Sequence, residues 1–401
     1  MIAQRTISNA TVALFAVAGG IAVANVYYLQ PLLQLIVLDF HASAQSVGLV
    51  SVMVQAGYAL GILAFVPLGD LVQPRPLVCG MFATVAVMLG LAASAPTVTL
   101  LGVAAFAFAT CTTCAQILLP YGADLADPAS RGRIVGTIQT GLITGTLVAR
   151  AGGGLVGARF GWRTVLWCAA VLCAGAAIAL WRAMPQRPPR ATVPYRALIA
   201  SILGMIVRYA PLRVSMGLGA LAFAAFAAIW TVLAFHLHEL GYGSAVAGGI
   251  GALSIVSAFA ARYGGALADR RGTLFTGTAA WLILVVAMLT FATLGWTLPG
   301  IVCAAVIFPL GMSLTQLSNQ IRIFSLNDEA RSRLNTAYMF AIFTGGALGA
   351  TAATLTWARA GWNGTCVLLL ALVIAMAPLL WWYRTDARAT AVGAFGRPKE
   401  S

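Results

Sequence analysis

Long stretches without charge are the feature that most constrains the fold of this chain. Only 8% of the 401 residues are charged, whereas 61% are hydrophobic. Because a soluble domain is about half apolar and a quarter charged, water cannot be the solvent for most of this surface. A helix needs roughly 20 apolar residues to cross a bilayer, so the sequence predicts about twelve membrane-spanning helices. They cover residues 11–36, 46–69, 77–95, 99–123, 134–157, 163–183, 214–237, 245–267, 274–294, 299–323, 334–357 and 364–383.

The first apolar segment has two interpretations. Arg5, the run behind it and small residues near Ala22 and Ala24 resemble a secretory signal peptide. However, the run continues through NVYYLQPLLQLIVL, and its removal would leave a broken internal repeat. We therefore expect a retained first span.

The basic residues are placed asymmetrically. With a cytoplasmic N-terminus, about 18 of the 24 Lys and Arg residues fall in cytoplasmic turns, a central linker and the C-terminal tail. This bias predicts that both termini of a multi-pass membrane protein are cytoplasmic. It also explains the net charge of +14 without a nucleic-acid partner.

Metal and cofactor chemistry has little support in the sequence. All seven cysteines lie in apolar segments, and the pair Cys111 and Cys114 has no accompanying His or second Cys pair. His236 and His238 are two positions apart and would not share a helix face. We predict no metal site and no cofactor.

The chain contains an internal repeat. Motifs at matching points of the two halves are offset by 200 residues, and Asp70 and Asp269 by 199. The pairs are DPASRGR (127–133) with NDEARSR (327–333), ARFGW (158–162) with ARAGW (358–362), and Gly145 with Gly345. Six spans duplicated in one orientation predict two six-helix bundles related by a pseudo-twofold axis along the membrane normal.

The repeat predicts a division of the chain into four parts. Residues 1–184 and 214–384 form the two bundles, 185–213 form a basic, proline-rich cytoplasmic linker, and 385–401 form a cytoplasmic tail. Within the linker, residues 195–208 have helical spacing with Arg at both ends. They form either a short helix at the membrane interface or part of a merely basic linker.

GGALADRRG at 264–272 resembles the loop signature of the major facilitator superfamily, Gly-x-Leu-x-Asp-Arg-x-Gly, which joins the second and third helices of each half. The matching residues are Gly265, Leu267, Asp269, Arg270 and Gly272. In the first half Asp70 and Arg75 match, but Val66, Leu71 and Gln73 replace other signature positions. NVYYLQPLL (25–33), AQILLP (115–120) and RSRLNTAYM (331–339) look like bacterial arabinose-efflux-like and drug-efflux-like permeases of that superfamily.

The resemblance implies a gating latch between the bundles. Asp70 would contact the start of the eleventh span near Asn335, and Asp269 the start of the fifth near Ile134. A carboxylate is stabilised near a helix N-terminus by roughly 0.3–1 kcal/mol. Asp124 would join Asp70 and Arg75. The alternative is that these are generic turns that only set the topology.

The fifth span departs from the pattern of antiporters in this superfamily. It keeps Gly141 and Gly145 but has Thr146 in place of a proline, and Arg150 in place of a glycine. Arg150 follows Arg133 by 17 positions, which places it roughly 25 Å into the membrane. A charge at that depth is costly unless it faces a partner or a wet cavity, which favours a functional role. An Arg that caps carbonyls near the outer interface is the alternative.

Other polar residues occur at comparable depths, and the resemblance implies that spans one, four, seven and ten line a substrate cavity. Each of them could instead make an interhelical hydrogen bond. Around Arg150, amides, phenols and an indole would suit an amphipathic or anionic organic solute. The candidates are Asn25, Tyr28, Gln30, Gln55, Gln116, Trp230, Gln316 and Asn319.

A proton-binding group is harder to identify, because every acidic residue lies at or near the end of a predicted span. The candidates for a proton switch are Asp39 with His41 outside span one, and His236, His238 and Glu239 outside span seven. The alternative is that they are ordinary interfacial polar residues.

These features, together with the resemblance to bacterial permeases, imply a monomeric secondary transporter in the lipid bilayer of the bacterial inner membrane. It would export small organic compounds, drug-like or sugar-like, by alternating access in exchange for protons. Uncoupled or proton-coupled uptake of an organic anion, and a transport-inactive sensor on the same fold, remain open. A membrane enzyme is disfavoured, because the three histidines lie near span ends without a Ser/His/Asp cluster.

Overall fold

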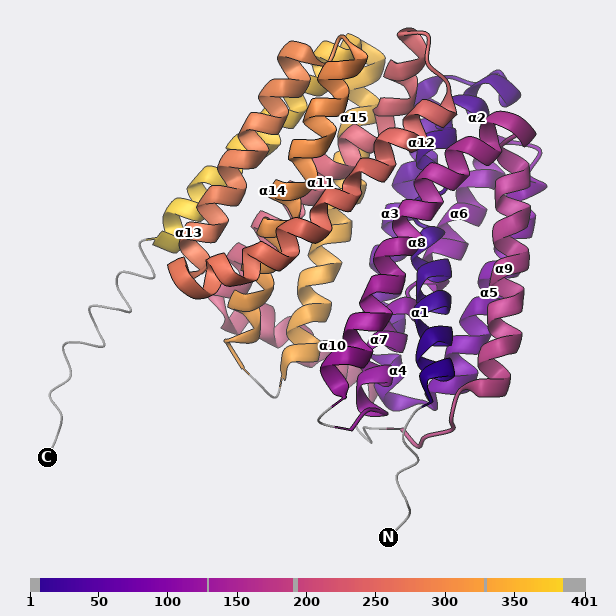
Figure 1. The fold of residues 1–401 in the computed structure, drawn as a ribbon, viewed down its shortest axis with the longest axis vertical. Helices are drawn as coiled ribbons and strands as arrows, with labels where there is room; N and C mark the ends of the chain where they lie inside the picture. The colour runs from indigo at the N-terminus through magenta and orange to yellow at the C-terminus, as the bar shows by residue number, and fades with distance from the viewer. Residues whose placement is uncertain (1–7, 128–129, 190–193, 328–329, 385–401) are drawn as a thin grey trace, which may run out of the picture.

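The computed structural model describes residues 8–127, 130–189, 194–327 and 330–384, apart from the side chains of 257–266 and 269. Within these ranges the backbone forms α-helices, two short 3₁₀-helices and turns, without strands. Figure 1 shows two helix bundles side by side, one from each half of the chain. The predicted all-α fold is confirmed.

The first bundle contains a broken first span and a broken fourth span. The first consists of α1, η1 and α2, and the fourth of α6 and α7, which meet at Thr113. The helices are α1 (Asn9–Ala24), η1 (Gln30–Leu32), α2 (Leu33–Phe40), α3 (Ala44–Phe65), α4 (Leu68–Leu71), α5 (Pro74–Ala93), α6 (Val98–Thr112), α7 (Cys114–Asp124), α8 (Arg131–Phe160) and α9 (Trp162–Ala183).

The second bundle follows the linker helix α10 (Tyr195–Arg208), and its seventh and tenth spans are continuous. Its eighth span is broken, like the first span of the other bundle, by a 3₁₀ segment. The helices are α11 (Ala210–Glu239), α12 (Ser244–Ala252), η2 (Leu253–Ile255), α13 (Val256–Leu294), α14 (Leu298–Phe324) and α15 (Arg331–Ile374), followed by a helical segment at 376–384.

Eight helices of the described chain are long and apolar enough to cross a membrane. One of them, Arg331–Arg384, reverses direction at Gly361 and supplies two spans. The first and eighth spans fall outside this set because their breaks divide them into shorter apolar helices. The fifth span, α8, is long but carries four Arg residues. The twelve predicted spans are thereby accounted for.

Glycines make the sharp reversals between spans. Gly161, Gly272 and Gly361 have φ angles of 84°, 82° and 53°, in a region that side-chain-bearing residues rarely adopt. Gly161 and Gly361 end the fifth and eleventh spans at repeat-related positions. Gly272 confirms the predicted turn after ALADRR. In the first half the equivalent turn uses Gln73 at φ −62° followed by Pro74, so it needs no glycine.

The internal repeat is visible in helix packing within each bundle. A Cβ added at Gly145 of α8 would lie 2.5 Å from Gly20 Cα of α1. A Cβ added at Gly345 of α15 would lie 2.7 Å from Ala220 Cα of α11. Both residues of the second contact are offset by 200 from those of the first. Small residues permit this approach, which is how helices associate in lipid.

The same symmetry relates two contacts between the bundles. We call the end where α1 and α8 begin the inner end, following the charge-based prediction, and the opposite end the outer end. Near the outer end, a Cβ on Gly154 would lie 2.9 Å from Gly248 Cα, and one on Gly48 would lie 2.6 Å from Thr354 Oγ1. Gly48 and Gly248, and likewise Gly154 and Thr354, are 200 residues apart. These four residues form what we call the outer seal.

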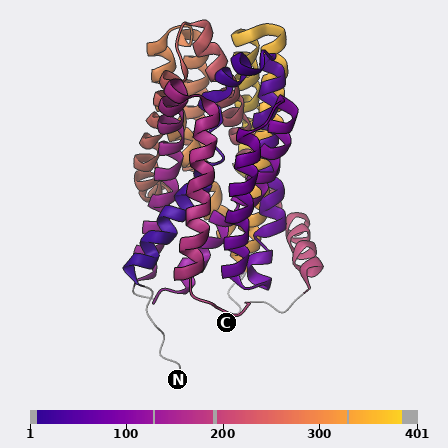
Figure 2. The same cartoon turned by 90° about the vertical axis from the view of Figure 1, so that its right-hand side faces the viewer.

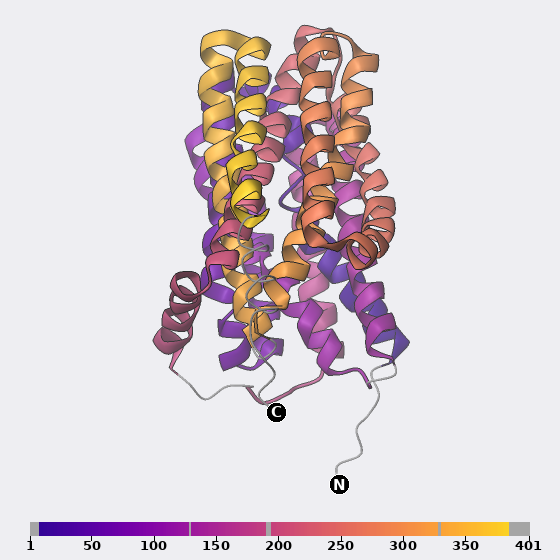
Figure 3. The same cartoon turned by 90° about the vertical axis from the view of Figure 1, so that its left-hand side faces the viewer.

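The surface and the linker fit a membrane location. Large apolar side chains on the flanks, such as Val171 and Val367, are 69% exposed, as expected for residues facing lipid. Figures 2 and 3 show α10 beside the bundles at the inner end. The Tyr195 hydroxyl donates to the Ala64 carbonyl of α3 at 3.0 Å, and Leu203 and Val207 are exposed. Of the two alternatives for residues 195–208, a short helix or part of a merely basic linker, the structure has the helix.

Candidate functional site: the cavity between the bundles

A cavity of about 240 Å³ lies between the two bundles. Its lining comes from α1, α3, α7 and α8 of the first bundle and from α11, α14 and α15 of the second. We call it the central cavity. Gln116 lines it and donates its Nε2 hydrogen to the Tyr58 hydroxyl at 3.2 Å. Gln316 lines it from the opposite bundle.

A second cavity of about 220 Å³ adjoins the first and contains Arg150. The two cavities share several lining residues, among them Tyr27, Phe223 and Gln316. We call the second space the arginine cavity. A third cavity of about 320 Å³ shares Gln116 with the central one and continues to Arg331 and Ser332 at the start of α15. The hollow space therefore runs from Arg150 toward the inner end, whereas the outer seal closes the other end.

Arg150 is 1% exposed and is held by neutral hydrogen-bond partners from both bundles. Its Nε donates to Gln30 Oε1 at 3.1 Å, and its Nη1 donates to Ser254 Oγ at 3.0 Å. Gln30 lies in η1 and Ser254 in η2, so both acceptors come from the points where the first and eighth spans are broken. The third nitrogen, Nη2, is buried without a hydrogen-bond partner.

Aromatic rings surround the same guanidinium group. Its Cζ lies 4.2 Å from the ring centroid of Trp230, 4.7 Å from that of Tyr27 and 5.0 Å from that of Phe226. These distances permit cation–π interactions, which are worth about 2 kcal/mol or more when the cation is desolvated. The predicted functional position of Arg150 is therefore compatible with the geometry, since it is buried, aromatic-lined and beside a cavity.

The structure distributes the other predicted cavity residues among several environments. Asn25 donates to the Cys173 sulfur at 3.3 Å, inside the first bundle. Tyr28 lines a groove between α1 and α8. Gln55 is buried, and its Cδ lies 3.5 Å from the position that a Cβ on Gly346 would occupy. Asn319 Oδ1 accepts from Arg322 Nη1 at 3.4 Å inside the second bundle.

Several residues that contribute to the site have no signal in the sequence. Phe223 and Phe226 line the cavities, but in an apolar span they look like any other lipid-facing or packing residue. Ser254 is one of many small residues in its segment. Only the helix break at 253–255 places its hydroxyl beside Arg150.

At the inner end, Asp70 and Ser332 line one cavity of about 90 Å³, which places Asp70 near the first turn of α15. Asp124 forms an ion pair with Arg131 at 3.5 Å. Arg75 stacks on Trp181, with its Cζ 4.8 Å from the ring centroid. Arg270 is exposed. The latch predicted for Gly265 and Asp269 concerns side-chain positions outside the described residues, so it stays a prediction.

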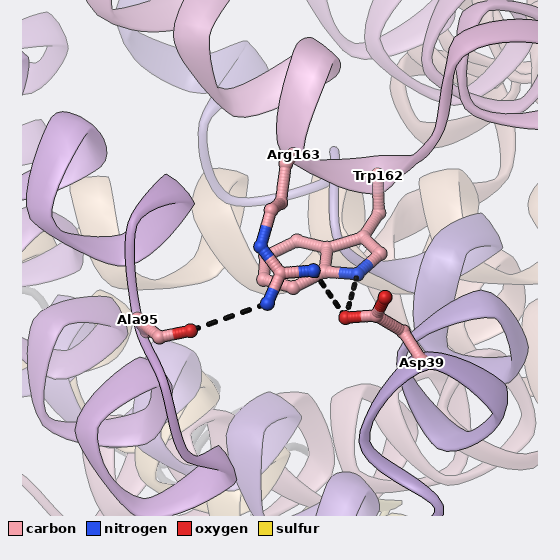
Figure 4. A network of polar contacts seen from close by, with 4 residues as sticks. All are labelled: Asp39, Ala95, Trp162 and Arg163. Carbon is pink, nitrogen blue, oxygen red and sulfur yellow. Dashed lines mark hydrogen bonds and ion pairs between the residues drawn. The ribbon is translucent and has the colours of Figure 1, made fainter.

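The candidates for a proton switch lie at the outer end in two different settings. Figure 4 shows that Asp39 accepts hydrogen bonds from Trp162 Nε1, at 3.3 Å, and from Arg163 Nη1. The other nitrogen, Arg163 Nη2, donates to the Ala95 carbonyl at 3.3 Å. His41 is exposed and has a left-handed backbone, with φ 49°.

His236 is instead buried among tryptophans. Its ring stacks on Trp362 at 3.9 Å with an interplanar angle of 4°, and Trp296 and Trp357 meet it edge-on. Its Nε2 lies 2.8 Å from the Gly295 carbonyl oxygen, and its Nδ1 lies 3.8 Å from Glu239 Oε2. His238 and Glu239 are exposed. The predicted cluster therefore divides into one buried histidine and two exposed side chains.

The sequence is similar to those of known transporters and of a known family. The model of the Major Facilitator Superfamily matches residues 15–326. The uncharacterized transporter YgaY of Escherichia coli is 36% identical over 380 residues, which cover 94% of this chain and 96% of that protein. A probable transporter of Streptomyces coelicolor is 33% identical over 378 residues, 94% of this chain and 86% of that protein. A chloramphenicol resistance protein of Streptomyces lividans is 31% identical over 122 residues, 29% of this chain and 30% of that protein.

Solved structures share the fold. A bacterial homolog of the human lysosomal transporter Spinster, in an inward-facing and unoccupied conformation, superposes with a TM-score of 0.75 at 16% identity. That match covers 97% of this chain and 98% of the homolog. The nucleoside transporter NupG superposes with a TM-score of 0.74 at 13% identity, over 94% and 98% of the two chains. The chain therefore belongs to the major facilitator superfamily, as a multi-pass membrane transporter of small molecules and not an enzyme.

Proposed function

We propose that this transporter exports small organic compounds across the bacterial inner membrane by alternating access, in exchange for protons. The observation that carries the proposal is the space between the bundles. It is closed at the outer end by two symmetry-related contacts and continues toward the inner end. Rocking of the bundles about such a space would expose it to each side in turn.

Export is the direction that the similarities favour. Part of the chain is similar to a chloramphenicol resistance protein, and the name of that protein denotes resistance to a drug. The segments at 25–33, 115–120 and 331–339 resemble those of efflux-like permeases, which also favours export. A cavity walled by aromatic rings with a few polar groups suits organic compounds better than inorganic ions.

His236 is the proton-binding residue that we propose. Among the described residues, the linings of the central and arginine cavities include no Asp or Glu. His236 is the buried member of the predicted candidates, and its Nδ1 faces Glu239, whose carboxylate would stabilise the imidazolium. It contacts the turn at 295–296 between α13 and α14, and Trp357 and Trp362 on either side of the reversal in α15, so its charge could bias the packing of these helices.

Everted membrane vesicles test both parts of this proposal. Their lumen corresponds to the outer side, so acidifying the lumen should drive accumulation of an exported compound by several-fold. A protonophore should abolish this accumulation. Candidate compounds come from a thermal-shift screen of the purified protein. Accumulation that does not depend on the pH gradient would contradict proton exchange. The absence of flux for every stabilising compound would favour a sensor.

The substitution His236→Phe tests the assignment of the proton site. Phenylalanine keeps the stack on Trp362 but cannot bind a proton. We expect His236→Phe to retain substrate exchange without a gradient and to lose most of the gradient-driven accumulation. If the variant accumulates the compound as wild type does, another group carries the proton.

A further inference from the structure

We propose that the arginine cavity binds the carboxylate of an aromatic organic monoanion, with Arg150 as its counter-ion. This inference rests on the proposed function and adds the substrate class. The juxtaposition that supports it is a buried cation, one free guanidinium nitrogen and a continuous wall of rings at the deep end of a cavity.

The charge of Arg150 is unbalanced. Among the residues that the structure describes, no carboxylate lies within ion-pair distance of its guanidinium, and its two hydrogen-bond partners are neutral. The acid nearest in sequence to Ser254 on the same span is Asp269. It follows Ser254 by 15 residues, or about 22 Å along a helix. A buried charge without a counter-ion is unfavourable, so the site gains stability from an anion.

The geometry of the free nitrogen selects the type of anion. Nη2 of Arg150 is buried and unpaired, and the side chain lines the arginine cavity. A guanidinium group matches a carboxylate in shape and in hydrogen-bond direction. A neutral ligand would leave the charge uncompensated and a cation would be repelled. One arginine balances one negative charge, which favours a monoanion over a dianion.

The walls of the site select the rest of the ligand. The rings of Phe223 and Phe226 stack at 5.0 Å, and Phe223 meets Phe343 at 4.8 Å. Tyr27 meets Phe226 edge-on at 6.4 Å. These rings extend from Arg150 into the central cavity. A flat aromatic group can pack against them with its carboxylate at Arg150, because ring pairs at 4.5–7 Å are favourable.

The site also joins the two bundles. Arg150 and Gln30 belong to the first bundle and Ser254 to the second, and a Cβ on Gly251 would lie 2.7 Å from Arg150 Cβ. A carboxylate at Nη2 would therefore bind to the side chain that contacts the second bundle just inside the outer seal. The ligand would thus bind to a residue that touches the outer seal, because a Cβ on Gly248 would overlap the Arg150 carbonyl oxygen.

Ligand-induced thermal stabilisation of the purified protein in detergent tests the substrate class. The probes are 3-phenylpropionate and its neutral amide of the same shape, 3-phenylpropionamide. For wild type we expect the acid to bind at least tenfold more tightly than the amide. Arg150→Gln should abolish this preference. Arg159→Gln removes the same charge from the exposed end of the same helix and should retain it.

The outcomes separate this inference from the proposed function. Equal stabilisation of wild type by acid and amide, no stabilisation by the acid, or an acid preference that survives Arg150→Gln would each overturn the inference. Export of other compounds in everted vesicles could still stand in those cases. If Arg150→Gln does not fold, the comparison of acid with amide on wild type decides. A failure of flux for every compound would instead reject the proposed function.

Discussion

At the outer end, equivalent loop carbonyls of the two bundles are contacted by different side chains. Ala95 and Gly295 are repeat-related residues in equivalent loops, and each presents a carbonyl to a nitrogen-bearing side chain. In the first bundle the donor is Arg163, and in the second the contact is made by His236. Trp162 and Trp362 are also repeat-related, and each packs beside that nitrogen-bearing side chain. The loop carbonyl and the tryptophan are repeated in both bundles, whereas the side chain that contacts the carbonyl differs.

Asp39→Asn should weaken this network only slightly. Asp39 and Arg163 are 41% and 38% exposed, and exposed ion pairs contribute about 0–1 kcal/mol. We expect Asp39→Asn to lower the free energy of unfolding in detergent by less than about 1 kcal/mol. Arg163→Gln should cost more, because it also loses the bond to Ala95 and the contact with Trp162. Chemical unfolding measures both variants. Loss of gradient-driven transport in Asp39→Asn would instead identify Asp39 as a proton site.

At the scale of elements, glycines decide how closely helices pack. Gly145 and Gly152 lie on the same helix, α8, seven residues apart. A Cβ on Gly145 would overlap the backbone of α1, whereas one on Gly152 would meet no atom closer than 3.8 Å. The two positions therefore differ in their neighbours while sharing helical backbone and membrane surroundings.

The matched pair Gly145→Ala and Gly152→Ala tests this difference. Alanine is favoured over glycine in a helix interior by about 0.5–1 kcal/mol, so Gly152→Ala should be neutral or stabilising. Gly145→Ala must push α8 away from α1 and should cost about 1–3 kcal/mol. Thermal unfolding of the purified variants measures the ranking. Equal stability of the two variants would mean that α1 and α8 are not in contact in the membrane.

At the scale of the whole molecule, transport requires the outer seal to open. Its two contacts, between α3 and α15 and between α8 and α12, are related by the repeat, so they can open together as the bundles rock. A Cβ on Gly48 would lie 3.4 Å from Thr354 Cβ, close to the spacing of about 3.5–4.5 Å in a disulfide.

A disulfide across this contact should lock the outer end. In a background without the native cysteines, Gly48→Cys combined with Thr354→Cys should cross-link under oxidation and lose most transport. Reduction should restore it, and each single variant should transport under both conditions. Mass shift after thiol labelling measures the cross-link. Full transport by the oxidised, cross-linked protein would contradict an outer seal that opens in the cycle.

Much of the architecture could be predicted because its causes are local. Apolar runs of sufficient length must be spans, and the basic turns bias their orientation. Gly161, Gly272 and Gly361 occupy positive-φ turns, a requirement that the neighbours along the chain impose. The depth of Arg150 follows from counting residues along one helix. None of these inferences needs the position of another helix.

Which face of a helix lines the cavity depends on the neighbouring helices, and the sequence alone could not predict it. It could not distinguish Gln116 and Gln316, which line the cavity, from Asn25 and Asn319, which bond inside their own bundles. All four are amides at similar depth, and only helix rotation separates them. By itself the sequence determined a duplicated membrane bundle with a charge buried in it. The tertiary structure decided what surrounds that charge, because Gln30, Ser254 and the rings reach Arg150 from helices far apart in the chain.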